Sequence, residues 1–236
     1  MFGIRRVQNA VGRRALLWRS RRRTTRAWGG APLVILPGVL DPIATRVGAW
    51  LAEVIAGEAQ AGERWLDMGC GTGIVGLALA ARGTVTTAVD IDPVCVANAR
   101  ENAALRRLAM EVVQSDHFAG LDPDRRWDAV VYNPPFWLGD PRSGGFAAPP
   151  PGAADLGRAF HGGEDFSVLR AFLAEAPHRA TRIYVALSES APAWPRAVDA
   201  MKGAEVVLRE RREGETLVLH RLWCPGSPKG SPTIMA

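Results

Sequence analysis

The sequence predicts an α/β fold with a mostly parallel, doubly wound sheet. From residue 33 onward, short apolar runs alternate with longer segments of helical character, an alternation typical of parallel strands connected through helices. A glycine-rich turn joins a strongly apolar run to the helical segment after it, as is common in such sheets. The last two apolar runs are separated only by Gly214, so they predict an antiparallel hairpin at the end of the sheet.

The expected elements follow one another in a regular order. The apolar segment LVILPGVL (33–40) precedes a helix over 41–58, with Asp41 as its N-cap and Pro42 at its first position. We expect strands over residues 64–70, 84–90, 110–116, 127–133, 181–188, 204–213 and 215–223. We expect further helices over 73–82, 93–108 and 164–176, and near 195–202. Residues 138–163 are rich in Gly and Pro and are expected to form a long loop, which is usually functional or disordered.

The size and composition indicate one globular domain with short appendages. A chain of 236 residues, 47% hydrophobic and 22% charged, can form one substantial core. We expect an Arg-rich, partly flexible arm over residues 1–32, a folded domain over 33–225 and a disordered tail over 226–236. The longest uncharged apolar run, Gly73 to Ala81, is too short to cross a membrane.

The cysteines exclude two kinds of stabilising site. Cys70, Cys95 and Cys224 are odd in number and widely scattered, which fits neither a disulfide framework nor the spacing of metal ligands. We therefore expect no metal, and a reducing compartment such as the cytoplasm.

The basic character of the chain is confined to its first residues. Residues 1–26 contain nine arginines and no acidic residue; subtracting their charge from the net +5 leaves −4 on the rest. Three interpretations stay open: a solvated arm without a specific role, an arm that contacts RNA or another polyanion, and an organelle transit peptide.

The glycine-rich turn carries the first signal of a ligand site. LDMGCGTGIVG places four glycines between a strand and a helix: Gly69, Gly71, Gly73 and Gly76. Glycines there let the backbone approach a ligand closely and leave helix amides directed at it. Asp67, before the first glycine, would repel a pyrophosphate but suits an amine or a cation. Asp90, at the end of the next strand, can accept hydrogen bonds from both hydroxyls of a ribose.

From Trp65 to Phe136 the chain resembles the class I S-adenosylmethionine (SAM) methyltransferases, whose first motif is similar to LDMGCGTG. The resemblance implies a Rossmann-like sheet of seven strands, with SAM as the cofactor. It implies that the methionine half of SAM is lined by Asp67, Gly69, Gly71 and Gly73. It also implies contacts to the ribose, the adenine ring and the adenine amine by Asp90, Ile91 and Asp116, respectively.

A second motif, NPPF, ends the strand expected over 127–133 and comprises Asn133, Pro134, Pro135 and Phe136. Ligands of open parallel sheets lie beyond the carboxyl ends of the strands, so this turn should lie beside the methyl group. The side-chain carbonyl of Asn133 and the backbone carbonyl of Pro134 would accept hydrogen bonds from a planar N–H group and push electron density onto its nitrogen. The prolines would keep these acceptors rigid, and Phe136 would stack on the planar group. Phe136 and Trp137 are expected to be exposed.

The NPPF tetrad resembles the motif of methyltransferases that act on planar nitrogens, and two features favour different substrates. Residues 159–177, AFHGGEDFSVLRAFLAEAP, resemble the HemK-type glutamine methyltransferases of release factors, in which a Gly-Gly-x-Asp turn opens a helix. Those enzymes usually have Tyr where this chain has Phe136, whereas Phe is commoner in ribosomal RNA base methyltransferases of the small-domain type.

We therefore expect a SAM-dependent N-methyltransferase with a macromolecular substrate, either a protein or a ribosome-associated RNA. A protein glutamine amide is favoured, and an exocyclic amine of a nucleic-acid base or a small-molecule nitrogen is an alternative. A non-catalytic SAM-fold subunit is disfavoured, because an inactive copy has no need to keep Asp67, Asp90 and Asn133 together. The sequence does not indicate an oligomeric state.

Overall fold

The computed structural model describes residue 16 and residues 18–140, 142, 146–191, 194–212 and 214–224. Its centre is a seven-stranded sheet in the order β5-β4-β3-β6-β7-β9-β8. In that order the strands are Glu111–Gln114, Val85–Asp90, Arg64–Met68, Trp127–Tyr132, Ala180–Ser188, Glu215–Trp223 and Glu205–Arg212. Strand β9 is antiparallel to both β7 and β8, and the other pairs are parallel. The predicted α/β sheet with its antiparallel C-terminal hairpin is confirmed.

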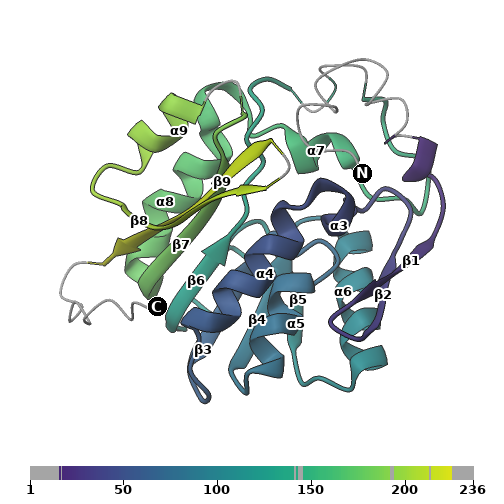
Figure 1. The fold of residues 1–236 in the computed structure, drawn as a ribbon, viewed down its shortest axis with the longest axis horizontal. Helices are drawn as coiled ribbons and strands as arrows, with labels where there is room; N and C mark the ends of the chain where they lie inside the picture. The colour runs from purple at the N-terminus through teal and green to yellow at the C-terminus, as the bar shows by residue number, and fades with distance from the viewer. Residues whose placement is uncertain are drawn as a thin grey trace.

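Helices cover both faces of the sheet (Figure 1). Helices α4, α5 and α6 pack side by side (Val47–Glu58, Ile74–Ala81 and Pro93–Arg106), while α8 packs on β7 and α9 packs on α8 (Ser167–Arg179 and Trp194–Ala200). Strand β3 lies between β4 and β6, so the chain leaves the centre of the sheet in opposite directions from β3 and from β6. This reversal opens a crevice at the carboxyl ends of these strands, where ligands of such folds bind.

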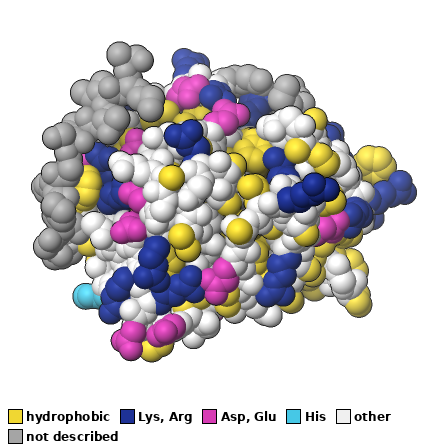
Figure 2. Space-filling model, turned by 90° about the horizontal axis from the view of Figure 1, so that it is seen from below, with side chains coloured by type: hydrophobic (Ala, Val, Ile, Leu, Met, Phe, Trp, Pro, Cys, Tyr) yellow, Lys and Arg dark blue, Asp and Glu magenta, His cyan; other side chains and the backbone are white. Residues whose placement is uncertain are grey.

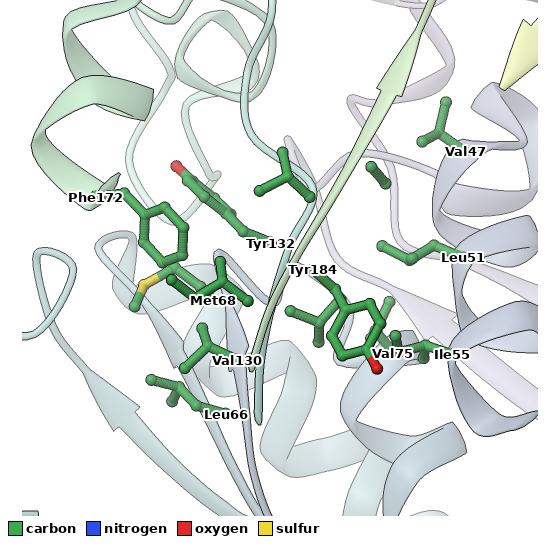
Figure 3. Packing of buried hydrophobic residues seen from close by; sticks show 14 of the residues in the cluster. Val47, Leu51, Ile55, Leu66, Met68, Val75, Val130, Tyr132, Phe172 and Tyr184 are labelled. Carbon is green, nitrogen blue, oxygen red and sulfur yellow. The ribbon is translucent and has the colours of Figure 1, made fainter. Parts of the chain in front are cut away.

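The core is formed by side chains from both layers of helices and from the central strands. Figure 3 shows part of it: Leu66 and Met68 of β3, Val130 and Tyr132 of β6, Tyr184 of β7, Leu51 and Ile55 of α4, and Phe172 of α8. Such buried aliphatic and aromatic groups each contribute about 1.5–3 kcal/mol to folding. None of the described helices is long and apolar enough to cross a membrane.

The helix expected over 41–58 is divided in two. Asp41 caps the first part, α3 (Pro42–Thr45), by accepting hydrogen bonds from the backbone N–H groups of Ile43 and Ala44. At Arg46 the backbone enters the left-handed region, with φ 70°, and α4 begins at Val47. The N-cap prediction is therefore confirmed, and the single helix was wrong.

Part of the expected arm is a β-hairpin, β1 (Thr24–Trp28) and β2 (Ala31–Ile35), which packs on α6. The side chains of Asn98 and Asn102 bind the backbone of Val34, and the guanidinium of Arg106 lies over the ring of Trp28. The region expected to be a partly flexible arm therefore contains strand β1 and the start of strand β2. Residues 1–15 of the arm and the expected tail over 226–236 lie outside the described residues.

The expected loop over 138–163 contains a short helix, α7 (Leu156–Phe160), whose Leu156 and Phe160 are buried. The N–H of Ala154 donates to the carbonyl of Pro37, and the N–H of Asp155 donates to the carboxylate of Asp92. These bonds hold the segment against the crevice. The loop prediction was therefore wrong for α7, which forms one wall of the site described next.

Candidate active site

A cavity of about 450 Å³ lies at the carboxyl ends of β3, β4 and β6. Small-molecule sites have volumes of roughly 300–1,000 Å³, so it is large enough for a cofactor. The structure brings nearly all predicted site residues to its walls: Asp67, Gly69, Gly71, Asp90, Ile91, Asp116, Asn133, Pro134, Pro135 and Phe136. Gly73 is not among the lining residues. A Cβ atom at Gly73 would lie 3.0 Å from the Cβ of Ala99, so this glycine allows α5 to pack against α6.

The glycine-rich turn is held by carboxylates on both sides. The N–H of Gly71 donates to the Oδ2 of Asp90 over 2.9 Å, and the N–H of Gly76 donates to the Oδ2 of Asp67 over 2.8 Å. A Cβ atom at Gly71 would meet nothing within 4 Å, so the backbone there borders open space. The turn therefore presents bare backbone to the cavity, as expected for close approach of a ligand.

The two carboxyl groups have unusual protonation behaviour. Burial raises the pKa of Asp67 to about 7, despite the opposing hydrogen bond from Gly76. Burial also raises the pKa of Asp90, against the hydrogen bonds from the backbone N–H groups of Asp92 and Gly71. A buried carboxylate is stabilised by a cation, so Asp67 is suited to an amine. Asp90 uses one acceptor position on each oxygen and keeps others for hydroxyl donors.

The other end of the cavity is more open. Ile91 is 42% exposed, an unusual state for an isoleucine beside a buried strand and one that a flat ring would relieve. The side chain of Asp116 is exposed, and its carboxylate lies 3.4 Å from the Nδ1 of His117. This arrangement fits the expected place of an adenine ring, with Ile91 against its face and Asp116 at its edge.

The NPPF turn lies at the centre of the cavity wall. The Oδ1 atom of Asn133 is buried and accepts no hydrogen bond within the described part of the chain. A buried carbonyl without a partner costs about 1–3 kcal/mol, so its retention indicates a ligand that donates to it. Pro134 and Phe136 line the same cavity. The expected exposure of Phe136 and Trp137 was wrong, because each is only 8% exposed.

Trp137 fixes the turn to the segment that follows α7. Its N–H donates to the carbonyl of Phe160, and its carbonyl accepts from the N–H of Gly162, both over 2.8 Å. Its ring packs against Phe160 and meets the ring of His161 at 89°. The NPPF turn and the Gly-Gly segment are thus joined by backbone hydrogen bonds next to the turn, which their separation in sequence does not reveal.

Several further polar residues line the cavity and were missed by the sequence analysis, among them Thr72, Tyr132 and His161. The hydroxyl of Thr72 is buried without a hydrogen-bond partner in the described structure. The Nδ1 of His161 lies 3.0 Å from the carbonyl of Gly157, and because a carbonyl only accepts, Nδ1 carries a hydrogen; in a neutral ring Nε2 is then an acceptor. Only the GGED signal placed a motif near His161, and nothing in the sequence marked Tyr132 or Thr72.

These residues fit SAM. The same cavity is lined by bare glycine backbone, a buried carboxylate suited to the amine, a second carboxylate suited to the ribose and an exposed Ile91. The Oδ1 of Asn133, which accepts no hydrogen bond from a described residue, belongs to the same site. Within the described residues no cluster of His, Cys, Asp and Glu could hold a metal ion.

Comparison with known proteins agrees with this geometry. Residues 46–145 match the family model of the methyltransferase small domain. Among solved structures, T. thermophilus 16S rRNA N2 G1207 methyltransferase, in complex with AdoMet and guanosine, has a TM-score of 0.60 at 20% identity, over 86% of this chain and 50% of that one. The sheet is therefore the Rossmann-like sheet found in this solved methyltransferase, and the predicted fold is confirmed.

Curated relatives of this chain act on two kinds of substrate, as their names state. Release factor glutamine methyltransferase of Deinococcus radiodurans is 34% identical over 154 residues, which are 63% of this chain and 53% of that protein. Ribosomal RNA small subunit methyltransferase C of Chromohalobacter salexigens is 46% identical over 76 residues, 32% of this chain and 22% of that protein. The chain thus spans about half, or less, of the length of these relatives.

Proposed function

We propose that the chain is a SAM-dependent N-methyltransferase that acts on a planar nitrogen. The observation that carries this proposal is the Oδ1 of Asn133, a buried acceptor without a partner beside a cavity that fits SAM. A structural asparagine would satisfy this oxygen from within the protein, as Asn98 and Asn102 do: their Oδ1 atoms accept from the backbone N–H groups of Leu36 and Val34, respectively. In this function the missing donor is the substrate.

The residues of the turn would orient the target nitrogen. The carbonyl groups of Asn133 and Pro134 accept its two N–H hydrogens, which fixes the plane of the group and returns electron density to the nitrogen. Phe136 covers one face of that plane. When bound, SAM supplies an activated methyl group, so the protein needs to position the nitrogen rather than to provide a nucleophile of its own.

A protein glutamine amide is the substrate that the findings favour. The match to the release factor enzyme of D. radiodurans extends over 63% of this chain, twice the share covered by the ribosomal RNA enzyme of C. salexigens. The Gly162–Gly163 segment, which suggested this class, is paired directly with the turn after Phe136. On the face seen in Figure 2, Lys and Arg lie in separate groups with acids and apolar atoms between them.

An exocyclic amine of a ribosomal RNA base is the second candidate. Phe136 at the fourth motif position and the 46% identity to the C. salexigens enzyme support it. Both substrates present a flat NH₂ group to the same acceptors, so the chemistry of Asn133 is common to them.

Methyl transfer from tritium-labelled SAM distinguishes these substrates. The wild-type chain and Asn133→Ala are each incubated with a purified bacterial release factor and, separately, with ribosomal RNA. We expect label in a glutamine of the release factor, located by mass spectrometry, and none with the variant. Label in RNA alone would contradict the glutamine amide as the substrate and support the exocyclic amine of an RNA base. Label in neither, with SAM bound, would contradict both macromolecular substrates.

A further inference from the structure

Tyr132 is a cavity residue to which the proposed function gives no role. It is the last residue of β6, pairs with Met68 of β3 and immediately precedes Asn133. It is 5% exposed, yet it lines the cavity. Figure 3 shows its ring among the core side chains, with the hydroxyl directed away from Leu66 and Val130.

The ring of Tyr132 is held tightly by its neighbours. Its edge would lie 3.1 Å from a Cβ atom at Gly69, the first glycine of the turn. Phe172 packs against it with ring centroids 4.8 Å apart, and the ring of His117 meets it edge-on. Side chains locked in this way hold their terminal atoms at fixed positions, as binding groups must.

The hydroxyl of Tyr132 lacks a partner in the described structure, in contrast to the chain's other tyrosine. No hydrogen bond joins it to a described residue, whereas the hydroxyl of Tyr184 donates to the carboxylate of Glu58 over 3.0 Å. Burial, reinforced by the negative charges of Asp90 and Asp116, raises the pKa of Tyr132 well above its usual value, so the phenol keeps its proton. It is therefore a donor, and the hydroxyl of a tyrosine whose ring is buried usually finds a partner.

We propose that the Tyr132 hydroxyl is a further cofactor-binding group, which donates a hydrogen bond to a ring oxygen or nitrogen in the nucleoside part of bound SAM. The proposal rests on the proposed function, because it requires SAM in this cavity. Its position between Gly69 and the carboxylates expected at the ribose and the adenine places it on the cofactor side.

The substrate is a less suitable acceptor for this donor. A hydrogen bond to the carbonyl of a glutamine amide would draw the nitrogen lone pair into the amide group. That effect opposes the acceptors at Asn133 and Pro134, which return electron density to the same nitrogen. A donor that serves the cofactor avoids this conflict.

Tyr132→Phe tests the proposal, with Tyr184→Phe as the matched control. Calorimetric titration measures the affinity of each protein for SAM and for 5′-methylthioadenosine, which lacks the amino-acid group. Loss of one neutral hydrogen bond predicts roughly 3- to 10-fold weaker binding of both ligands to Tyr132→Phe. Tyr184→Phe is expected to bind both as the wild type does.

Thermal unfolding without ligand separates binding from folding. Tyr132→Phe loses no hydrogen bond within the described structure, so its Tm should equal or exceed that of the wild type, whereas Tyr184→Phe should have a lower Tm. Unchanged affinity of Tyr132→Phe for SAM would overturn the role of the hydroxyl. Weaker binding of SAM with unchanged binding of 5′-methylthioadenosine would overturn its assignment to the nucleoside. Absence of SAM binding by the wild type would instead contradict the proposed function.

Discussion

The backbone carbonyl of Pro135 occupies the space where a side chain at Gly162 would begin: a Cβ atom there would lie 2.4 Å from the carbonyl oxygen. Only a glycine at position 162 therefore allows this segment to approach Pro135 so closely. The N–H of Gly162 also donates to the carbonyl of Trp137. At this point the NPPF turn and the Gly-Gly segment touch through backbone atoms. The position of the acceptors at Asn133 and Pro134 therefore depends on a residue far along the chain.

Gly162→Ala should displace the turn. The clash with a backbone atom cannot be relieved by rotating a side chain, so we expect a loss of about 1–3 kcal/mol in the free energy of unfolding, together with a loss of methyl transfer. Gly57→Ala is the control, because that site lies within α4 and has open space around it. The free energy of unfolding of Gly57→Ala, measured by urea titration, should exceed that of the wild type by about 0.5–1 kcal/mol. Equal effects of the two changes would contradict the contact.

Replacing Asn133 should lower turnover without weakening cofactor binding. Asn133→Ala removes the acceptor, and removal of one such pre-organised group from an active site typically lowers turnover by about 10²- to 10³-fold. SAM affinity, measured by calorimetry, should stay within about 2-fold of the wild type, since the oxygen faces the substrate. Asn133→Asp keeps an acceptor oxygen and should retain more activity than Asn133→Ala. A parallel loss of SAM binding would mean that Asn133 is structural.

Asp90→Ala, in contrast, should weaken the binding of SAM. The change removes an acceptor for the ribose and also frees the N–H groups of Gly71 and Asp92. Hydrogen bonds to a charged group contribute about 1.5–3 kcal/mol, so SAM affinity should fall roughly 10- to 100-fold. The exposed Asp124 serves as control, and Asp124→Ala should bind SAM normally. Retention of full affinity by Asp90→Ala would remove this carboxylate from the site.

Asp67→Asn should make the ligand-free protein more stable at high pH. The pKa of Asp67 is about 7 in the folded state and about 3.9 in an unfolded chain, so between these values the folded state binds the extra proton. Wild-type stability therefore falls as the pH rises through this window. Asparagine removes the buried charge and keeps an acceptor for Gly76. We expect the free energy of unfolding of Asp67→Asn to exceed that of the wild type by up to about 4 kcal/mol at pH 8 and by almost nothing at pH 4. Denaturant titration at both pH values measures this difference.

The same variant should bind SAM less tightly at pH 8, because the amine loses its carboxylate partner. Higher stability combined with weaker binding is the signature of a group kept for its ligand. A variant that is less stable than the wild type at pH 8 would show that Asp67 is a structural residue.

His161 is expected to position the substrate through Nε2. His161→Asn can keep the donor to the carbonyl of Gly157 but lacks an acceptor at the position of Nε2, whereas His161→Gln places an amide near that position. We expect a higher KM for the methylated substrate with His161→Asn, partial recovery with His161→Gln, and unchanged SAM affinity in both. Identical kinetics of the two variants would indicate that the ring serves only in packing against Trp137 and Phe146.

The parts of the site that the sequence predicts are those in which one short segment performs the whole task. The turn from Asp67 to Gly71 carries its glycines, acid and following helix within a few residues, so its geometry is local. Asp90, at the end of its strand, could be placed because parallel strands bring their carboxyl ends together.

The parts that were missed depend on contacts between distant segments. Tyr132 looks like one more apolar residue in a buried strand, and only its position beside Gly69 sets its hydroxyl in the cavity. The β1–β2 hairpin was not predicted because its arginines made the segment look like a solvated arm. Their partners lie elsewhere in the chain: Arg26 binds Asp41, and Arg23 binds Glu101. The turn at Arg46 opposes local helical preference and is enforced by the close packing of Pro42 against Gly48.

Trp137 and Ala154 anchor the two ends of the segment between them. Trp137 is hydrogen-bonded to Phe160 and Gly162, and Ala154 to Pro37, so the chain leaves and rejoins the scaffold at two fixed points. Closing a longer loop costs little additional entropy, about 0.6 kcal/mol for each doubling of its length. Insertions between the anchors should therefore be tolerated if they keep Phe146, which is buried against Trp137 and Phe160. In the proposed enzyme such insertions would change the surface offered to the substrate and leave Asn133 in place.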